Sequence, residues 1–195
     1  MFSDSRLLLK LWLKNPMKIG AVAASSPELA SAMARHIPRD GVGYVVELGG
    51  GTGPVTRAIL AAGVPADRLV VVERDPTLHR HLAERYPGVR VLLGDAMHLQ
   101  QLLRREGVAP VRAIVSSLPL LSMKKAIQHR IVAQIFAVLE ADAPLIQFTY
   151  GLFSPIKNRQ RLGVSGAVKD RVLQNLPPAS VWLYRKGRDH NARAA

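Results

Sequence analysis

The chain has 195 residues and a hydrophobic fraction of 48%, which fits one globular domain with a sizeable core and excludes a disordered chain. It has no cysteine, which excludes disulfides and cysteine-based metal sites, and no apolar run of about 18 residues, which excludes a predicted membrane-spanning helix. Lysine and arginine number 27 against 14 acidic residues, and the net charge of +13 predicts attraction to nucleic acid or an anionic lipid surface.

Residues 3–14 are predicted to form an amphipathic helix that Ser3 or Ser5 caps and Pro16 ends. Basic residues recur every four positions, and leucines with a tryptophan occupy the opposite side. This pattern is typical of a helix that lies in a membrane interface, although a helix packed on the sheet is an alternative. If it binds membranes, deleting residues 1–14 should abolish sedimentation with anionic liposomes. The candidate membrane-binding residues are Arg6, Leu8, Lys10, Trp12 and Lys14.

Residues 15–43 are expected to lead into the core. Small residues over 15–26 suit a lid or linker. Ser26 then caps a helix that has Pro27 at its first position and runs to about His36. Residues 38–43 form the loop that follows.

Residues 44–53 are predicted to form a strand and a glycine-rich loop, with a helix from there to about Ala62. The spacing G-x-G-x-G lets the backbone turn sharply and approach a ligand, and the helix N-terminus adds free N–H groups. The dinucleotide fingerprint G-x-G-x-x-G is absent, because Pro54 stands where the third glycine belongs. The loop therefore predicts a different nucleoside cofactor, with a plain tight turn as the alternative.

Of two further predicted strands, the one over 69–73 ends in an acidic residue and the one over 89–93 is followed by one. A helix over 77–85 separates them. Glu73 can accept hydrogen bonds from ribose hydroxyls, or it is an ordinary exposed residue before the next helix. Together with Asp95 in Gly94-Asp95-Ala96 and Glu47, it is expected at the ends of successive strands. Ligands of open parallel sheets bind there.

The remaining elements alternate in the same way. Helices are predicted over 98–106 and 123–139, and strands over 112–116 and 145–150, with a possible closing hairpin over 165–176 and 180–185. Such alternation predicts a doubly wound, mainly parallel α/β sheet. We expect one domain over 1–195 with its catalytic core at 44–186. Residues 151–195 carry nine basic and two acidic residues, so the end of the chain, with its tail at 187–195, holds most of the excess charge.

The pattern E-x-G-x-G-x-G at residues 47–53 resembles motif I of class I S-adenosylmethionine-dependent methyltransferases. The resemblance implies a Rossmann-like fold with a mainly parallel seven-stranded sheet and a C-terminal hairpin, preceded here by the amphipathic helix. It also implies that the acidic residue before the loop holds the methionine end of S-adenosylmethionine and that Asp95-Ala96 receives the adenine amino group. The implied cofactor-binding residues are Glu47, Gly49, Gly51, Gly53, Glu73, Asp95 and Ala96.

Residues 116–120 are expected to contact the methyl acceptor. Methyltransferases that act on a base nitrogen have Asn/Asp/Ser-x-Pro-aromatic there, but Leu120 cannot stack on a base. The chain is similar over nearly its whole length to the bacterial phospholipid N-methyltransferases, which convert phosphatidylethanolamine stepwise to phosphatidylcholine. The matching segments are 15–22, 25–26, 47–49, 116–121, 147–150 and 176–179 with Trp182, and Gly50 stands where that family often has proline.

This second resemblance implies phosphatidylethanolamine and its methylated forms as substrates and a location at the inner face of the cell membrane. Anionic lipids are the expected partners, and neither a metal nor nucleic acid is expected. Tyr150 could hold the headgroup cation by a cation–π contact, or it is a core aromatic. An RNA adenine dimethyltransferase and a non-catalytic membrane-binding module stay open as alternatives. No general base is identified, and the substrate-binding candidates are Ser116, Ser117, Leu118, Pro119 and Tyr150.

Overall fold

The structure is a computed structural model that describes residues 26–150, 153–157, 159–175 and 177–187. The predicted helix at 3–14, nearly all of the linker and the end of the basic tail lie outside the described residues.

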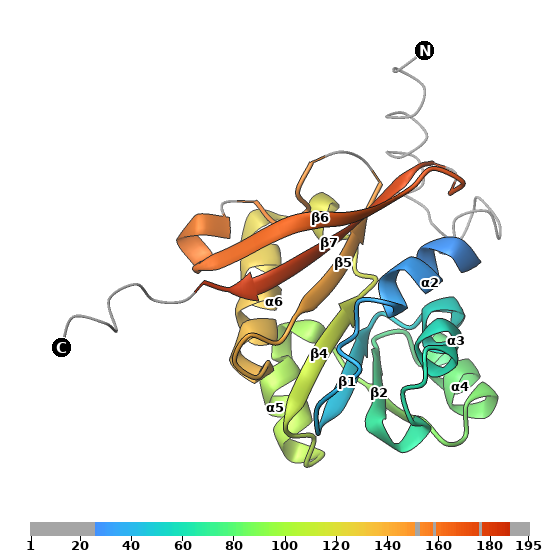
Figure 1. The fold of residues 1–195 in the computed structure, drawn as a ribbon. Coiled ribbons are helices and arrows are strands. Elements are labelled where there is room, and N and C mark those ends of the chain that lie inside the picture. Colours follow the sequence, from blue (N-terminus) through green and yellow to red (C-terminus); the bar gives the residue numbers. More distant parts are fainter. Residues whose placement is uncertain (1–25, 151–152, 158, 176, 188–195) are drawn as a thin grey trace.

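Seven strands form one sheet in the order β3-β2-β1-β4-β5-β7-β6 (Figure 1). The first five strands are parallel, and β7 runs antiparallel to both β5 and β6. This topology confirms the predicted Rossmann-like class I methyltransferase fold with a C-terminal hairpin. The strands are β1 (Tyr44–Leu48), β2 (Leu69–Glu73), β3 (Arg90–Leu93), β4 (Val111–Ser116), β5 (Leu145–Thr149), β6 (Val164–Val172) and β7 (Ala179–Lys186).

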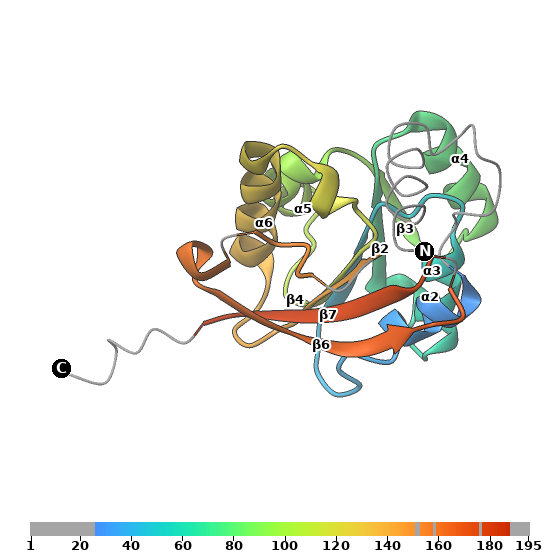
Figure 2. The ribbon, with the colours of Figure 1, turned by 90° about the horizontal axis from the view of Figure 1, so that it is seen from above.

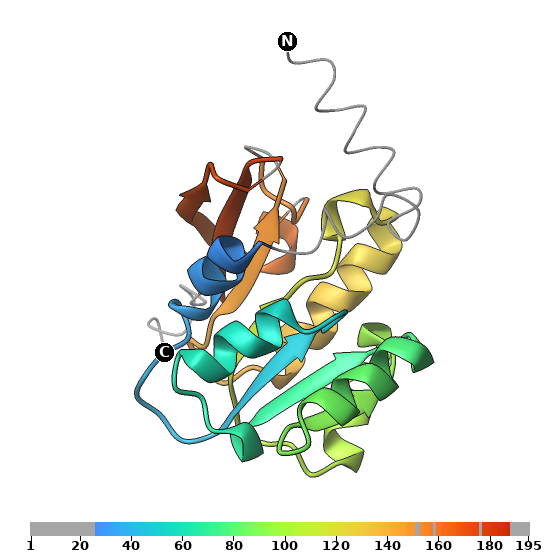
Figure 3. The same ribbon diagram turned by 90° about the vertical axis from the view of Figure 1, so that its right-hand side faces the viewer.

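Helices cover both faces of the sheet (Figures 2 and 3). The helices α2 (Pro27–Ala34), α3 (Pro54–Ala61) and α4 (Pro76–Arg85) share one core cluster with one side of the strands. The helices α5 (Leu99–Arg105) and α6 (Lys125–Val138) pack on the other side. Because both faces are covered, β2 is buried at every position, as its apolar run predicts.

The predicted element boundaries agree with the structure to within about two residues in most places. Ser26 caps α2 as expected, since its Oγ accepts from the Leu29 N–H at 3.2 Å. Short 3₁₀ helices, which were not predicted, occupy η2 (Ala66–Arg68), η3 (Ala96–His98), η4 (Leu120–Ser122) and η5 (Arg159–Leu162).

One boundary was wrong by four residues. The strand predicted to reach residue 176 ends at Val172. The reason is the side chain of Asn175, which accepts from the Ser26 N–H at 3.2 Å and donates to the Pro177 carbonyl at 2.8 Å. These bonds fold the chain into a turn instead of continuing the ladder.

Candidate functional site

The glycine loop joins β1 to α3 and leaves its outer side open. Gly51 has a φ of +57°, and a Cβ built on it meets no atom within 4 Å. Its N–H donates to Glu73 Oε2 at 3.0 Å, which ties the loop to the end of β2. The loop therefore offers free space next to a backbone held in the left-handed region, where glycine is strongly favoured.

The inner side of the same loop is tightly packed. A Cβ on Gly50 would lie 2.5 Å from Val71 Cγ1 and 2.8 Å from Leu82 Cδ1. A side chain at this position would push the loop away from β2 and α4. The absence of a side chain at position 50 thus allows the loop to pack closely against β2 and α4.

Glu73 organises the loop through its carboxylate. It is nearly buried, and its two oxygens accept backbone N–H groups from Gly51 at 3.0 Å, Arg74 at 2.8 Å and Asp75 at 2.9 Å. Two carboxylate oxygens offer about four acceptor positions, so one position is left for a ligand hydroxyl.

Glu47 is a buried carboxyl at the end of β1. Its Oε2 accepts from Thr56 Oγ1 of α3 at 2.7 Å, and its Oε1 has no partner among the described residues. Burial raises the pKa of Glu47 to about 7; the hydrogen bond from Thr56 lowers it, and the nearby charge of Glu73 raises it further. A cation placed near this carboxyl would favour its ionised form.

A cavity of about 250 Å³ opens at the carboxyl ends of β1, β2 and β3. Two carboxylates, Glu73 and Asp95, line it together with apolar side chains that include Met97 and Ile131. Asp95 Oδ1 accepts from the Met97 N–H at 2.8 Å. A mostly apolar cavity with a few placed acceptors fits a nucleoside. Of the predicted cofactor residues, the ones that line this cavity are Gly49, Glu73, Asp95 and Ala96.

The predicted acceptor segment follows β4. Two hydrogen bonds fix the backbone of Leu118: its N–H donates to Ser116 Oγ at 3.3 Å, and its carbonyl accepts from Gln147 Nε2 at 3.0 Å. Ser117 N–H donates to the Leu48 carbonyl at 2.9 Å, which fixes the segment beside the glycine loop.

A second cavity, of about 40 Å³, lies on the other side of this segment. Leu118 and Pro119 line both cavities and so form a shared wall. Tyr150 lines the smaller one with Phe148, and their rings meet edge to face at 5.2 Å between centroids. Ser117, whose buried hydroxyl has no partner in the described part of the chain, also lines it. A group entering this cavity would lie next to a ligand in the larger one.

Most of the predicted site residues thus lie near the two cavities, but they do not all line them. Ser116 lines neither cavity and holds the Leu118 N–H instead. Gly51 and Gly53 shape the loop, and Glu47 is buried at its base. No sequence pattern assigned a role to Phe148 or Gln147. The two-residue period of a strand could have identified Phe148, because it shares a face with Tyr150.

Within the described ranges, no helix is long and apolar enough to cross a bilayer, and no three potential ligands cluster as a metal site would require.

Comparison with known proteins finds a relative that matches over nearly its whole length. An ornithine lipid N-methyltransferase of Singulisphaera acidiphila is 38% identical over 187 residues, which cover 93% of this chain and 96% of the relative. A ribosomal RNA small subunit methyltransferase A of Sinorhizobium fredii is 46% identical, but over only 38% of this chain and 25% of its own length. No protein-family model matches.

The fold is shared with solved methyltransferase structures. The 1,6-didemethyltoxoflavin N1-methyltransferase of Burkholderia thailandensis, solved with S-adenosylhomocysteine, superposes with a TM-score of 0.65. The two are 18% identical, and the match covers 94% of this chain and 87% of that one.

Proposed function

We propose that this chain, which belongs to the bacterial lipid N-methyltransferases that use S-adenosylmethionine, methylates the headgroup nitrogen of phosphatidylethanolamine at an anionic membrane surface. The reaction would run stepwise toward phosphatidylcholine. The 38% identity to a lipid N-methyltransferase across nearly both whole chains carries lipid headgroup N-methylation, and the resemblance of the sequence segments to phospholipid N-methyltransferases favours phosphatidylethanolamine.

The cofactor is S-adenosylmethionine, which supplies a methyl group already activated on a sulfonium. We assign its nucleoside part to the cavity of about 250 Å³. Glu73, which has an acceptor position left over, would take a ribose hydroxyl, and Asp95-Ala96 would receive the adenine amino group. Glu47 would favour the cationic methionine end, with Gly49, Gly51 and Gly53 giving the ligand room.

The acceptor nitrogen belongs, in this proposal, in the smaller cavity. Its volume of about 40 Å³, against about 250 Å³ for the cofactor cavity, suits the small amine end of a headgroup. Because Leu118 and Pro119 line both cavities, the acceptor nitrogen would lie next to the cofactor, as methyl transfer requires. Methyl transfer would form the N–C bond as the C–S bond of the sulfonium breaks, with S-adenosylhomocysteine as the leaving group.

The amine must lose a proton before it can attack. With a pKa of about 10.4 on the lysine model, forming the neutral amine near pH 7 costs about 4–5 kcal/mol. Removal of the ammonium from water into a cavity lined by Leu118, Phe148 and Tyr150 lowers its pKa and offsets part of this cost. The methylated cation that results can rest against the Tyr150 ring, a contact worth about 0.5–2 kcal/mol.

Ornithine lipid is the second candidate substrate. The name of the full-length relative favours it, and ornithine, like ethanolamine, presents a primary amine. The chemistry that the two cavities offer is the same for both lipids, so the test must compare them directly.

The decisive experiment incubates the full chain with methyl-labelled S-adenosylmethionine and three acceptors in parallel. These are vesicles with phosphatidylethanolamine, vesicles with ornithine lipid, and ribosomal RNA. Labelled mono-, di- and trimethylated phosphatidylethanolamine is the expected result. Label on ornithine lipid alone would select the second candidate, label on RNA alone would refute both, and no label anywhere would favour a non-catalytic module.

We also propose that residues 1–14 hold the chain at the inner face of the membrane through Arg6, Leu8, Lys10, Trp12 and Lys14. Their sequence pattern alone supports this. Three or four cations near an anionic surface contribute roughly 3–4 kcal/mol. Sedimentation of the chain lacking residues 1–14 with anionic liposomes tests the proposal.

A further inference from the structure

Exposed apolar side chains gather at one end of the sheet. In the part of the chain that the structure describes, five large hydrophobic residues are exposed. Leu93 ends β3, and Ile127 lies in the first turn of α6 and lines the cofactor cavity at the strand ends. Phe153 follows β5 and Leu173 follows β6. Four of the five therefore lie at the carboxyl end of the parallel strands, and Val42, before β1, lies at the other.

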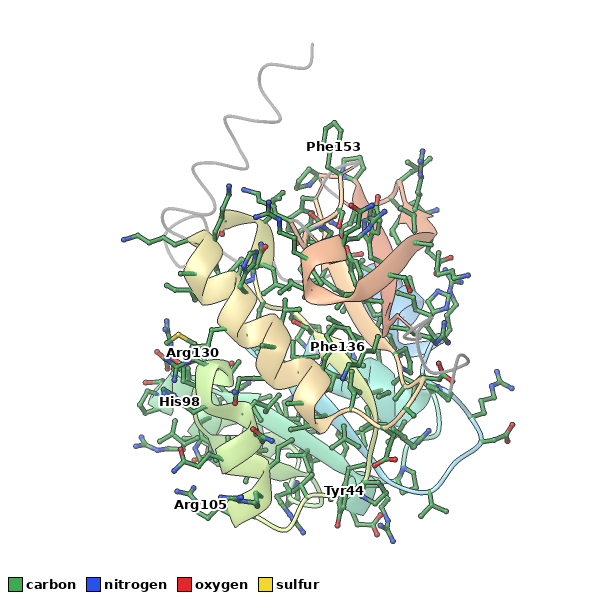
Figure 4. All side chains as sticks on the ribbon, turned by 90° about the vertical axis from the view of Figure 1, so that its left-hand side faces the viewer. Tyr44, His98, Arg105, Arg130, Phe136 and Phe153 are labelled. Atoms are coloured by element: carbon green, nitrogen blue, oxygen red, sulfur yellow. The ribbon has the colours of Figure 1, made fainter. Side chains whose placement is uncertain are left out.

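The strand register places Phe153 and Leu173 on the same side of the molecule. Thr149 of β5 pairs with Ser180 of β7, and Ala179 pairs with Val172, the last residue of β6. The turn after β6 thus begins beside the end of β5. The two side chains are 76% and 75% exposed, among the highest values for large apolar residues here. In Figure 4, Phe153 projects from one end of the molecule and Tyr44, which starts β1, lies at the other.

Both residues adjoin the acceptor cavity. Phe153 lies in the chain between Tyr150 and Pro155, which line that cavity. The turn that carries Leu173 also holds Asn175, whose side chain hydrogen-bonds to the Tyr150 side chain. Anything that covers Phe153 and Leu173 would therefore lie close to the acceptor cavity.

Cations flank these apolar tips. The exposed residues Lys124 and Lys125 start α6, and the backbone N–H of Lys157 donates to Gln128 Oε1 of the same helix at 3.1 Å. This combination suits the surface of a bilayer, because apolar side chains can enter the acyl region while lysines contact the anionic headgroups above it. Ser26, the first described residue, also lies at this end of the sheet, because its N–H donates to Asn175 Oδ1 at 3.2 Å.

We propose that this end of the sheet is a bilayer-docking surface on which Phe153 and Leu173 enter the acyl region and the three lysines meet anionic headgroups. The docking surface consists of Leu93, Lys124, Lys125, Ile127, Phe153, Lys157 and Leu173. The inference rests on the proposed function, since a lipid acceptor can reach the smaller cavity only if that cavity faces the membrane.

Vesicle binding tests the surface without any methyl transfer. The full chain is titrated with vesicles of phosphatidylglycerol and phosphatidylcholine, which contain no primary amine, and without cofactor. Transfer of one large side chain into apolar surroundings is worth about tenfold or more in an equilibrium constant. Phe153→Ser and Leu173→Ser should each weaken binding by about tenfold, and the matched control Val42→Ser should leave it unchanged. Equal binding by all three variants would overturn the proposal.

A local probe separates this surface from any binding by residues 1–14. In a Trp12→Phe background the remaining natural tryptophan, Trp182, is buried and gives the same signal in every variant. Against it, a tryptophan at Phe153→Trp should be quenched by lipids brominated on their acyl chains, and one at Val42→Trp should not. Equal quenching at both sites, quenching at neither, or a response at Phe153→Trp to RNA but not to vesicles would refute docking through this surface. Because no methylation is measured, quenching at Phe153→Trp would stand even if phosphatidylethanolamine proved not to be the substrate.

Discussion

The buried carboxyl of Glu47 makes the stability of this protein depend on pH in a direction unusual for an acidic residue. Burial raises its pKa from the ordinary 4.5 to about 7. Between those two values the folded chain binds a proton that the unfolded chain has released. Stability contributed by the protonated group is therefore complete below about pH 4.5 and is lost as the pH rises through about 7.

The size of the effect follows from the shift. At about 1.36 kcal/mol per pKa unit, a change from 4.5 to about 7 corresponds to about 3 kcal/mol lost by alkaline pH. Most of that loss, about 2 kcal/mol, falls between pH 5 and pH 8. Glu47→Gln removes the titration and keeps a side-chain oxygen that can accept from Thr56 Oγ1.

Urea unfolding of the cofactor-free protein, followed by circular dichroism from pH 5 to pH 8.5, checks this. The free energy of unfolding of Glu47→Gln should gain about 2 kcal/mol on that of the wild type over this range. Glu84→Gln, at an exposed position in α4, is the control for removing one acidic side chain. If the wild type and Glu47→Gln follow parallel pH profiles, the buried carboxyl does not titrate as the structure implies.

Three further substitutions test the two cavities and the loop. Glu73→Gln should raise the Kd for S-adenosylmethionine by about tenfold or more in calorimetry, because charge-assisted hydrogen bonds are worth about 1.5–3 kcal/mol; an unchanged Kd would argue against a cofactor contact. Tyr150→Ala should lower methylation by about tenfold at an unchanged cofactor Kd, and a loss of cofactor affinity by the same factor would mark Tyr150 as structural. Gly50→Ala should destabilise the fold by about 1–3 kcal/mol in thermal unfolding, because its Cβ would lie 2.5 Å from Val71 Cγ1. An unfolding temperature equal to that of the wild type would show that Val71 and Leu82 move aside without cost.

The order of helices and strands along the chain could be predicted because the sequence patterns that indicate each element are local. A strand reads as a short β-branched run, and a helix start reads as a cap such as Ser26 followed by Pro27. The acidic residues at 47, 73 and 95 could be placed at neighbouring strand ends because parallel strands share a carboxyl end. The seven-stranded order confirms that reasoning, and the family comparison confirms the cofactor that it pointed to.

The end of β6 shows where local signals stop. Its residues continue a strand pattern toward 176, but Asn175 bonds to Ser26, 149 positions earlier in the chain. The secondary-structure propensities of residues 173–176 carry no information about that contact. The turn, and with it the position of Leu173, depends on which distant segment lies beside it.

The alternating architecture, the glycine loop and the residue types of the cofactor site follow from the amino-acid sequence, because each depends on periods and spacings within a few residues. Three features required the folded chain: Leu118 and Pro119 lie between two adjoining cavities, Glu47 is buried with its pKa raised, and Phe153 and Leu173 project from the same end of the sheet. The burial of a side chain and its neighbours in space depend on contacts between segments that are distant in the sequence. A local sequence pattern carries no information about those contacts.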